Sequence, residues 1–207
     1  MKIINASYRI ETPIYGEELL KSIEKAGRTC YKSEDRITEE SAKSFVQKLI
    51  ERGHESVLEH ESITVRFICD RGISHEIVRH RLASYSQEST RYCNYSGDRF
   101  GSELTFIRPC FLMGKPWAYC AWDNAMGFAE NVYFDLLSDG CTPQEARSVL
   151  PNSIKTEVVM TANLREWRHF LKLRTAKAAH PQMRELTVPL LHELQERIPI
   201  VFDDIQP

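Results

Sequence analysis

Residues 79–92 carry the sequence RHRLASYSQESTRY, the most informative stretch of the chain. These fourteen residues include three arginines, one histidine, two tyrosines and four hydroxyl groups of serine or threonine. An arginine guanidinium binds two oxygens of a phosphate at once, and hydroxyl groups can donate to the oxygens that remain. A guanidinium buried without a partner loses its hydration at a large free-energy cost. The stretch therefore predicts either an exposed polar loop or a binding site for an anionic ligand.

The length and charge of the chain limit the possible partners. Its 207 residues suit one domain, 1–207, or one subunit of an intimate oligomer. With 27 basic and 29 acidic residues, the net charge of −2 provides no general attraction for nucleic acid or an anionic membrane. We therefore expect no nucleic-acid partner and no membrane partner, and any attraction for phosphate must be local.

Cysteine usage and the lack of apolar segments bear on the cellular compartment. The six cysteines include no C-x-x-C pair, the chain opens without a signal peptide, and no apolar run is long enough to span a bilayer. These features favour reduced thiols in a cytoplasmic protein, and a disulfide framework is the weaker alternative.

Local patterns predict a helix-rich α+β single domain. Alternation and turn residues predict a strand at 2–10, a turn at 13–16, a strand at 62–68, a turn at 70–72, an irregular stretch at 93–116 with a short strand near Phe106, and a strand at 157–160. Helical spacing predicts helices at 38–52, about 73–82, 117–138, from Thr142–Pro143 onward, about 164–176 and 181–197. The helix at 117–138 is apolar on most sides, so we expect it to be buried between neighbours.

The predicted helix at 73–82 would carry the beginning of the 79–92 stretch. Glu76, Arg79 and His80 would share one face, which could equally be an exposed Glu–Arg pair. Arg81 would lie about 200° from Arg79, so the two arginines could not reach the same atom from an intact helix. Either the helix ends there, or the arginines serve two ligands or two subunits.

A second polar constellation is residues 161–174, TANLREWRHFLKLR. Asn163 and Glu166 have the character of a capping box, so Asn163 is expected to open a helix. The sequence predicts a basic face and an opposite apolar stripe: Arg165, Arg168, His169 and Lys172, against Leu164, Trp167, Phe170 and Leu171. Arg174 falls near the centre of the apolar stripe, where it needs a carboxylate, carbonyl groups or an anionic ligand. A structural ion pair and a ligand contact both remain open, and the basic face alone is typical of solvated surface.

Residues 54–60, HESVLEH, contain two histidines and two carboxylates, which invites a zinc interpretation. The spacing does not match H-E-x-x-H, whose histidines lie one helical turn apart, so no metal site is predicted. Arg147, in the segment EARSVLP, would ordinarily be a surface arginine on a short helix.

The pattern Arg-His-Arg-x-x-Ser-x-x-x-x-Ser-x-Arg-Tyr at 79–92 resembles the signature of the flavin-dependent thymidylate synthases. The segments at 54–60, 145–151 and 163–174 resemble further blocks of that family, in the same order, so the resemblance covers most of the chain. It implies a distinctive α/β fold and a homotetramer whose active sites draw on several subunits. The absence of G-x-G-x-x-G disfavours a Rossmann flavoenzyme.

The resemblance also implies the reaction: reductive methylation of dUMP to dTMP. FAD would be the hydride carrier, 5,10-methylenetetrahydrofolate the carbon donor and NADPH the reductant, with no cysteine nucleophile. Cys110 follows a proline as a tempting nucleophile would, but nothing in its local sequence would lower the pKa of its thiol, so we interpret it as structural.

The resemblance assigns roles to individual residues. Those implied as catalytic are Arg174, His54 and Ser89, with His54 beside the flavin ring and Arg174 polarising the uracil. Those on cofactor positions are Ser56, Arg79, His80, Arg81, Gln87, Asn163, Arg165 and His169. Those around dUMP are Glu76, Arg79, Gln87, Glu88, Ser89, Arg91, Arg147 and Arg174. No residue is assigned to a metal.

Three positions depart from the commoner family residues. Glu76 stands where many relatives have glutamine, Gln87 where they have glutamate, and His169 where they have asparagine. Two other functions compete. One is a single-stranded nucleic-acid module in which Arg79, Arg81 and Arg91 are interleaved with Tyr85 and Tyr92 as stacking partners. The other is a metal-dependent nucleotide hydrolase that uses the cluster at 54–60.

Overall fold

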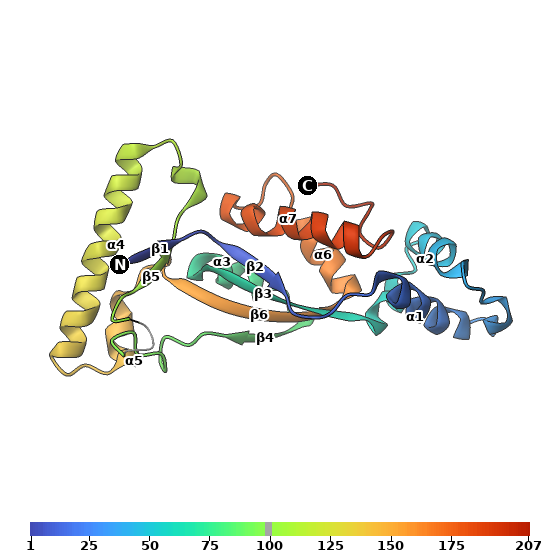
Figure 1. The fold of residues 1–207 in the computed structure, drawn as a ribbon, viewed down its shortest axis with the longest axis horizontal. Coiled ribbons are helices and arrows are strands. Elements are labelled where there is room, and N and C mark those ends of the chain that lie inside the picture. Colours follow the sequence, from blue (N-terminus) through green and yellow to red (C-terminus); the bar gives the residue numbers. More distant parts are fainter. Residues whose placement is uncertain (98–100) are drawn as a thin grey trace. The chain divides into compact units, whose positions relative to one another are not determined.

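The largest sheet has four strands in the order β2-β3-β6-β4 (Figure 1). They are β2 (Ser7–Ile10), β3 (Ser62–Asp70), β6 (Lys155–Asn163) and β4 (Ala83–Gln87). Alternate residues of β3 and β6 are buried, as expected for strands with one face on a core. The computed structural model describes residues 1–97 and 101–207. The predicted irregular stretch 93–116 includes residues 98–100, which lie outside the described residues.

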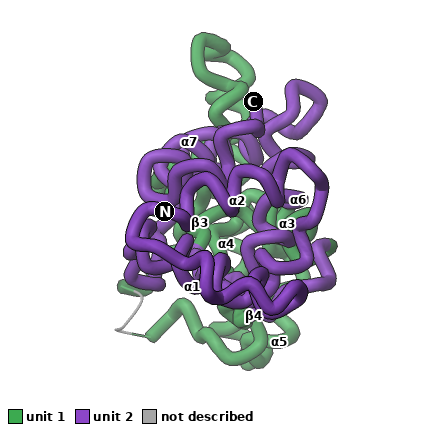
Figure 2. The backbone as a smooth tube through the Cα atoms, turned by 90° about the vertical axis from the view of Figure 1, so that its right-hand side faces the viewer, with its two compact units in different colours: residues 1–7, 67–79, 86–159 green, residues 8–66, 80–85, 160–207 purple. Residues whose placement is uncertain are grey.

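The chain forms two compact units (Figure 2). Unit 1 comprises residues 1–7, 67–79 and 86–159, and unit 2 comprises residues 8–66, 80–85 and 160–207. Three strands, β3, β4 and β6, contribute residues to both units. The prediction of mixed helix and strand is therefore confirmed.

Unit 1 is built around a long helix, α4 (Pro116–Ser138). Its other elements are β1 (Lys2–Ile4), α3 (Arg71–Ile77), β5 (Thr105–Ile107), η4 (Cys110–Leu112), α5 (Pro143–Ala146) and η5 (Arg147–Val149). Strands β1 and β5 pair in parallel. The core of the unit consists of Tyr95, Leu104, Phe106, Met126, Tyr133, Ala146 and Ile154.

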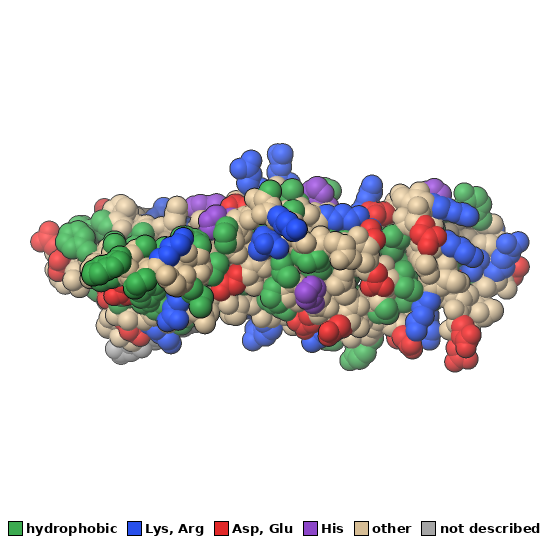
Figure 3. All heavy atoms as spheres, turned by 90° about the horizontal axis from the view of Figure 1, so that it is seen from above, with side chains coloured by type: hydrophobic (Ala, Val, Ile, Leu, Met, Phe, Trp, Pro, Cys, Tyr) green, Lys and Arg blue, Asp and Glu red, His purple; other side chains and the backbone are tan. Residues whose placement is uncertain are grey.

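The prediction that the long helix is buried was wrong for α4. Only Met126 and Tyr133 of its described residues are buried, whereas Trp117 is 88% and Phe128 71% exposed. Figure 3 shows hydrophobic side chains, in green, exposed at the left, where α4 lies in Figure 1. Helical periodicity identifies apolar faces, but it does not say what covers them within one chain.

Unit 2 consists mainly of helices. They are α1 (Gly16–Thr29), η1 (Glu34–Arg36), α2 (Ser41–Glu51), η2 (Glu55–His60), α6 (Leu164–Arg174) and α7 (Pro181–Arg197). Helix α1 packs closely on α2 at Gly27. A Cβ added there would lie only 2.8 Å from Cε1 of Phe45. The largest fully buried side chains of unit 2 include Leu20, Ile23, Leu58, Trp167, Arg168 and Phe170.

Two predicted boundaries near the 79–92 stretch were wrong. The predicted turn at 70–72 is the beginning of α3, since the Asp70 carboxylate caps the helix by accepting the Ile73 N–H at 2.7 Å. The helix then ends at Ile77 and does not continue to residue 82. Residues 83–87, for which no element was predicted, join the sheet as β4. Glu76, Arg79 and His80 therefore do not share one helical face.

The predicted strand at 2–10 is two strands. Its first part, β1, pairs with β5, and its second part, β2, belongs to the four-stranded sheet. All six cysteines are free thiols, so no disulfide framework is present. Among the described residues, no helix is both long enough and apolar enough to cross a membrane.

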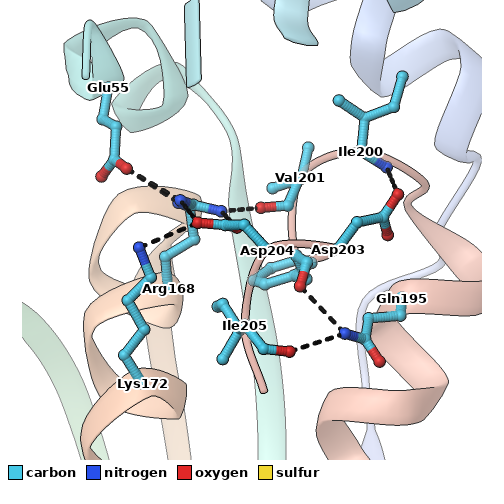
Figure 4. A network of polar contacts seen from close by, with 10 residues as sticks. Glu55, Arg168, Lys172, Gln195, Ile200, Val201, Asp203, Asp204 and Ile205 are labelled. Carbon is cyan, nitrogen blue, oxygen red and sulfur yellow. Dashed lines mark hydrogen bonds and ion pairs between the residues drawn. The ribbon is translucent and has the colours of Figure 1, made fainter. Parts of the chain in front are cut away.

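Arg168 of α6 anchors the C-terminal segment of unit 2 (Figure 4). The side chain is 1% exposed, and its guanidinium makes a bidentate pair with the Asp204 carboxylate at 2.6 and 2.8 Å. It also donates to Glu55 Oε1 at 3.0 Å and to the carbonyl of Val201. The prediction of a solvated basic face was thus wrong for Arg168, because the carboxylates that bury it lie far away in the sequence.

Candidate functional site

Unit 2 contains a pocket of about 640 Å³ along α6. It is lined by Glu55, Glu59, Leu82, Asn163, Arg165, Glu166, Arg168, His169 and Lys172. Asn163 begins the helix as predicted, since its side-chain oxygen accepts the Glu166 N–H at 2.9 Å. Arg165 pairs with Glu59 at 2.6 Å, and both side chains are about half exposed, so this ion pair is weak enough to exchange for a ligand.

In unit 2, the side chains of Arg174, His80 and Glu166 form a chain of polar contacts. The Nε–H of Arg174 donates to Nε2 of His80 at 3.1 Å, and Nδ1 of the same ring lies 3.2 Å from Oε1 of Glu166. Burial, the Arg174 cation and nearby His169 lower the pKa of His80 to about 4. Burial also raises the pKa of the Glu166 carboxyl group. The sequence left a structural ion pair and a ligand contact open for Arg174. The structure adds a third kind of partner, the neutral imidazole of His80.

The candidate metal ligands of the structure differ from those considered in the sequence. Ligand atoms of His80, Glu166 and His169 lie within 4.8 Å of one another. Both ring nitrogens of His80 already have hydrogen-bond partners, so its geometry is that of a hydrogen-bonded histidine. His54 directly precedes the 3-10 helix η2 and His60 is its last residue, and neither belongs to this group.

Unit 1 contains a second pocket, of about 400 Å³. Its lining consists of Arg71, Thr90, Gln144, Arg147, Ser148, Leu150, Pro151 and Asn152. Arg147 Nη1 donates to Thr90 Oγ1 at 3.4 Å, and Arg91 Nη2 donates to Gln144 Oε1 at 3.5 Å. Both distances are at the long limit for hydrogen bonds, so neither guanidinium is held firmly by these contacts.

Arg71 is the residue of this pocket that the sequence interpretation missed. Its Nη1 atom is buried and has no hydrogen-bond partner within the described part of the chain. An unsatisfied buried donor costs about 1–3 kcal/mol, and more when it is charged. Arg71 follows the capping residue Asp70 at the first position of α3, which was interpreted as a turn, so the local sequence did not draw attention to it.

Gln87 and Glu88 are engaged by groups of unit 1. The Gln87 amide donates to Ser74 Oγ at 2.9 Å and to Thr156 Oγ1 at 3.2 Å. Glu88 accepts from Tyr95 at 3.0 Å and from Lys155 at 2.9 Å. Both hydroxyl groups could instead donate to a glutamate at position 87, so these two contacts do not by themselves require glutamine.

The predicted site residues divide between the units by role. Unit 1 contains the predicted dUMP residues other than Arg174: Glu76, Arg79, Gln87, Glu88, Ser89, Arg91 and Arg147. Unit 2 contains Arg174 and the predicted flavin residues other than Arg79 and Gln87: His54, Ser56, His80, Arg81, Asn163, Arg165 and His169. His54, Ser56, Arg79 and Arg81 are exposed, which leaves them accessible to a ligand. Their individual roles remain predictions.

Known proteins resemble this chain over most of its length. The family model described as thymidylate synthase complementing protein matches residues 15–200. A protein of Pyrococcus furiosus named flavin-dependent thymidylate synthase is 34% identical over 182 residues, which are 87% of this chain and 72% of that protein. Proteins of the same name from Geobacter sulfurreducens and Corynebacterium efficiens are also 34% identical, over 88% and 97% of this chain and 80% and 84% of their own length.

The family match at residues 15–200 includes the residues that line both pockets and the 79–92 stretch. The chain is thus an enzyme that belongs to the family of the flavin-dependent thymidylate synthases.

Proposed function

We propose that the protein converts dUMP to dTMP, with FAD as the hydride carrier, 5,10-methylenetetrahydrofolate as the carbon donor and NADPH as the reductant. The observation that carries this proposal is the pocket in unit 1, where the buried Nη1 of Arg71 has no hydrogen-bond partner among residues 1–97 and 101–207 and lies beside Arg147 and Thr90. A nucleotide phosphate offers the oxygens that this guanidinium and its neighbours need.

The phosphate would be bound by charge and by hydroxyl groups together. Arg71 and Arg147 line the pocket, and Arg91 reaches its edge through Gln144. The chain as a whole has a net charge of −2, so the attraction is confined to this pocket. Such a site favours a compact anion over an extended nucleic-acid backbone.

Arg174 is the proposed group for the pyrimidine ring. Its cation would stabilise negative charge that develops on the uracil oxygens when the N3 proton is lost, which is the kind of electrostatic stabilisation that lowers reaction barriers most. The guanidinium is half-buried and its Nε–H is held by His80, so its orientation is set before any substrate arrives.

The pocket of unit 2 supports the proposal that this unit binds FAD. The exposed cations of Arg165 and Lys172 lie along its wall, and the N-terminus of α6, an eleven-residue helix, favours anions such as a pyrophosphate. Its volume is within the range of pockets that hold cofactors. When bound, the flavin supplies the hydride for the reduction, whereas Asn163, Arg165 and His169 would hold and orient it.

Cysteine has no place in the proposed chemistry. None of the six thiols is among the described residues that line either pocket. Burial raises the pKa of the Cys69 thiol, which makes this group a poor nucleophile. We also propose a cytoplasmic location, where free thiols remain reduced.

A homotetramer is the proposed assembly. The exposed apolar side chains of Trp117 and Phe128 on α4 support self-association, because monomers rarely expose several large apolar groups on one element. Light scattering on the purified protein tests this, and a monomeric mass would refute it.

The nucleic-acid alternative is weakened by Tyr85, one of its proposed stacking side chains. Its hydroxyl donates to the backbone carbonyl of His80 at 2.6 Å, and the residue is only partly accessible. This hydrogen bond fixes the position of the ring, which limits how it can adjust to stack on successive bases.

Arg71→Lys is expected to weaken dUMP binding by roughly 10-fold or more, because an ammonium group keeps the charge but loses the fork that can bind two phosphate oxygens. Isothermal titration of dUMP into the flavin-loaded protein measures the change. The matched control is Arg108→Lys, an exposed arginine of the same unit outside both pockets, and it should bind dUMP normally. Equal affinities for Arg71→Lys and the unmodified protein would remove Arg71 from the phosphate site.

Purified protein should show the visible absorption of oxidised flavin, and the molecule released on denaturation should be FAD. His54→Ala and Arg165→Ala should each lower the flavin content or slow its reduction by NADPH, since both are predicted flavin contacts. Lys21→Ala, which removes an exposed lysine paired with Glu18 on α1, serves as the control. A colourless protein that also fails to take up added FAD would contradict the proposal.

A further inference from the structure

We infer that Glu166 and His80 are positioning residues for Arg174: Glu166 fixes the tautomer of the His80 ring, and the unprotonated Nε2 of that ring orients the guanidinium. The inference deepens the proposed function, because it takes from it the role of Arg174 at the pyrimidine. All three residues belong to unit 2.

The hydrogen-bond pattern determines the tautomer. The Nε–H of an arginine can only donate, so His80 Nε2, 3.1 Å away, must accept and carry no proton. A neutral imidazole then carries its proton on Nδ1, which faces Glu166 Oε1 at 3.2 Å. A carboxylate in this place stabilises the Nδ1–H form, as second partners of functional histidines commonly do.

Burial protects the hydrogen bonds of the His80 ring from competition by water. His80 is 4% and Glu166 6% exposed, so water cannot easily replace either partner. The lowered pKa of His80 keeps the ring neutral at physiological pH, which preserves the lone pair that Arg174 uses. A charged imidazolium would offer a second N–H to the guanidinium and repel it.

Neighbouring residues fix the position of the His80 ring and of both ends of α6. The edge of Phe170 packs on the His80 ring with centroids 4.8 Å apart. Asn163 caps the first turn of α6, which contains Glu166, and Thr187 of α7 donates to the Arg174 carbonyl at 2.9 Å. Glu166 and Arg174 are eight residues apart, about 12 Å along a helix. The His80 ring therefore links the two ends of α6 through side chains.

The contact with His80 determines which nitrogens of Arg174 can reach a substrate. Because the Nε–H of Arg174 faces His80, any contact between this arginine and a nucleotide uses the terminal nitrogens of the guanidinium. Rotation about the last side-chain bonds would otherwise cost entropy when substrate binds, and an arginine oriented beforehand avoids most of that cost.

A double-mutant cycle on dUMP binding tests the inference. Glu166→Gln keeps the shape but lets the amide donate to Nδ1, which permits the wrong tautomer and displaces the guanidinium. We expect dUMP to bind about 10-fold more weakly to the flavin-loaded Glu166→Gln protein, and less than about 2-fold more weakly when the same change is made in Arg174→Ala. The matched control is Glu193→Gln, which removes a carboxylate that accepts from Tyr8 in the same unit.

A second variant separates positioning from simple stability. In His80→Gln the side-chain carbonyl can accept from Arg174 without help from Glu166, so adding Glu166→Gln should then change dUMP affinity by less than about 2-fold. Equal losses from Glu166→Gln in the presence and absence of Arg174 would overturn the inference and leave the proposed function intact. Failure of Arg174→Ala alone to affect dUMP binding or turnover would instead remove the arginine from the proposed site.

Discussion

Arg174→Ala should lose thymidylate synthase turnover by at least about 100-fold while keeping its fold and most of its flavin. Loss of one preorganised charge-stabilising donor typically lowers turnover by about 10²–10³. The flavin should remain, because the lining of the pocket along α6 does not include Arg174. Release of tritium from dUMP labelled at C5 measures turnover, and the visible spectrum measures flavin content.

Two further variants refine the Arg174 result. Arg174→Lys keeps a cation but cannot reproduce the planar group held by His80, so its turnover should also fall well below that of the unmodified enzyme. Arg197→Ala removes an exposed arginine that pairs with Glu193 on α7 and should have full turnover. Full tritium release by Arg174→Ala would reject its assignment to the pyrimidine.

Arg168→Ala should cause the largest loss of stability, about 3 kcal/mol in the free energy of unfolding, because hydrogen bonds to charged groups contribute about 1.5–3 kcal/mol and the packing of a buried side chain is lost as well. The change removes the donor of Glu55 and of the Val201 carbonyl, whereas Asp204, which is 45% exposed, keeps its contact with Lys172. For a chain of this size the unfolding midpoint should fall by roughly 10 °C. Differential scanning calorimetry measures it.

The matched control for Arg168 is again Arg197→Ala, whose exposed i,i+4 pair should contribute less than about 1 kcal/mol. Arg168→Met, with an apolar chain of similar length, should lose less stability than Arg168→Ala, since it keeps much of the packing. Similar midpoints for Arg168→Ala and Arg197→Ala would mean that the C-terminal segment is not anchored through this guanidinium.

The Arg168–Asp204 pair also predicts a pH dependence. Partial burial alone would raise the pKa of Asp204, but hydrogen bonds from Arg168 and Lys172 outweigh it and lower the pKa below its ordinary value. A carboxyl group with a lowered folded-state pKa stabilises the fold above its unfolded pKa, about 3.9. This contribution is lost as the pH falls through the folded-state pKa. The difference in midpoint between the unmodified protein and Asp204→Asn should therefore be constant from pH 7 to about pH 5 and shrink only below about pH 4.

The elements predicted correctly are those with strong local signals. Thr142 and Pro143 mark the beginning of α5, and a threonine-glutamate capping box is present there. Asn163 marks the beginning of α6 in the same way. The long helix α4 and the strand β3 follow from apolar periodicity. These signals are contained within one element, so a single sequence displays them.

The predictions that were wrong depend on distant partners. The missed helix α1 is the exception, since its buried residues Leu20, Ile23, Glu24 and Gly27 recur at helical spacing and its signal is local. Residues 83–87, for which no element was predicted, form β4 by pairing with β6, a strand far away in the sequence. The exposure of α4 is likewise a property of its surroundings and not of its periodicity.

For the candidate site too, the local sequence indicates the chemistry, whereas distant contacts determine some of the residues that take part. The arginines and hydroxyl groups of 79–92 indicate anion chemistry by residue type alone, whereas the resemblance supplied their roles. Arg71 and Glu166 were not predicted as site residues because nothing in their local sequence is unusual. Their importance arises from an unpaired buried nitrogen in one case and from a histidine 86 positions away in the other.

Anaerobic formation of dTMP from dUMP, 5,10-methylenetetrahydrofolate and NADPH by the flavin-loaded protein is the most direct test of the central claim. We predict dTMP production that depends on all three substrates and on bound FAD. A protein that binds FAD, has its native fold and still forms no dTMP under these conditions would contradict the proposed function.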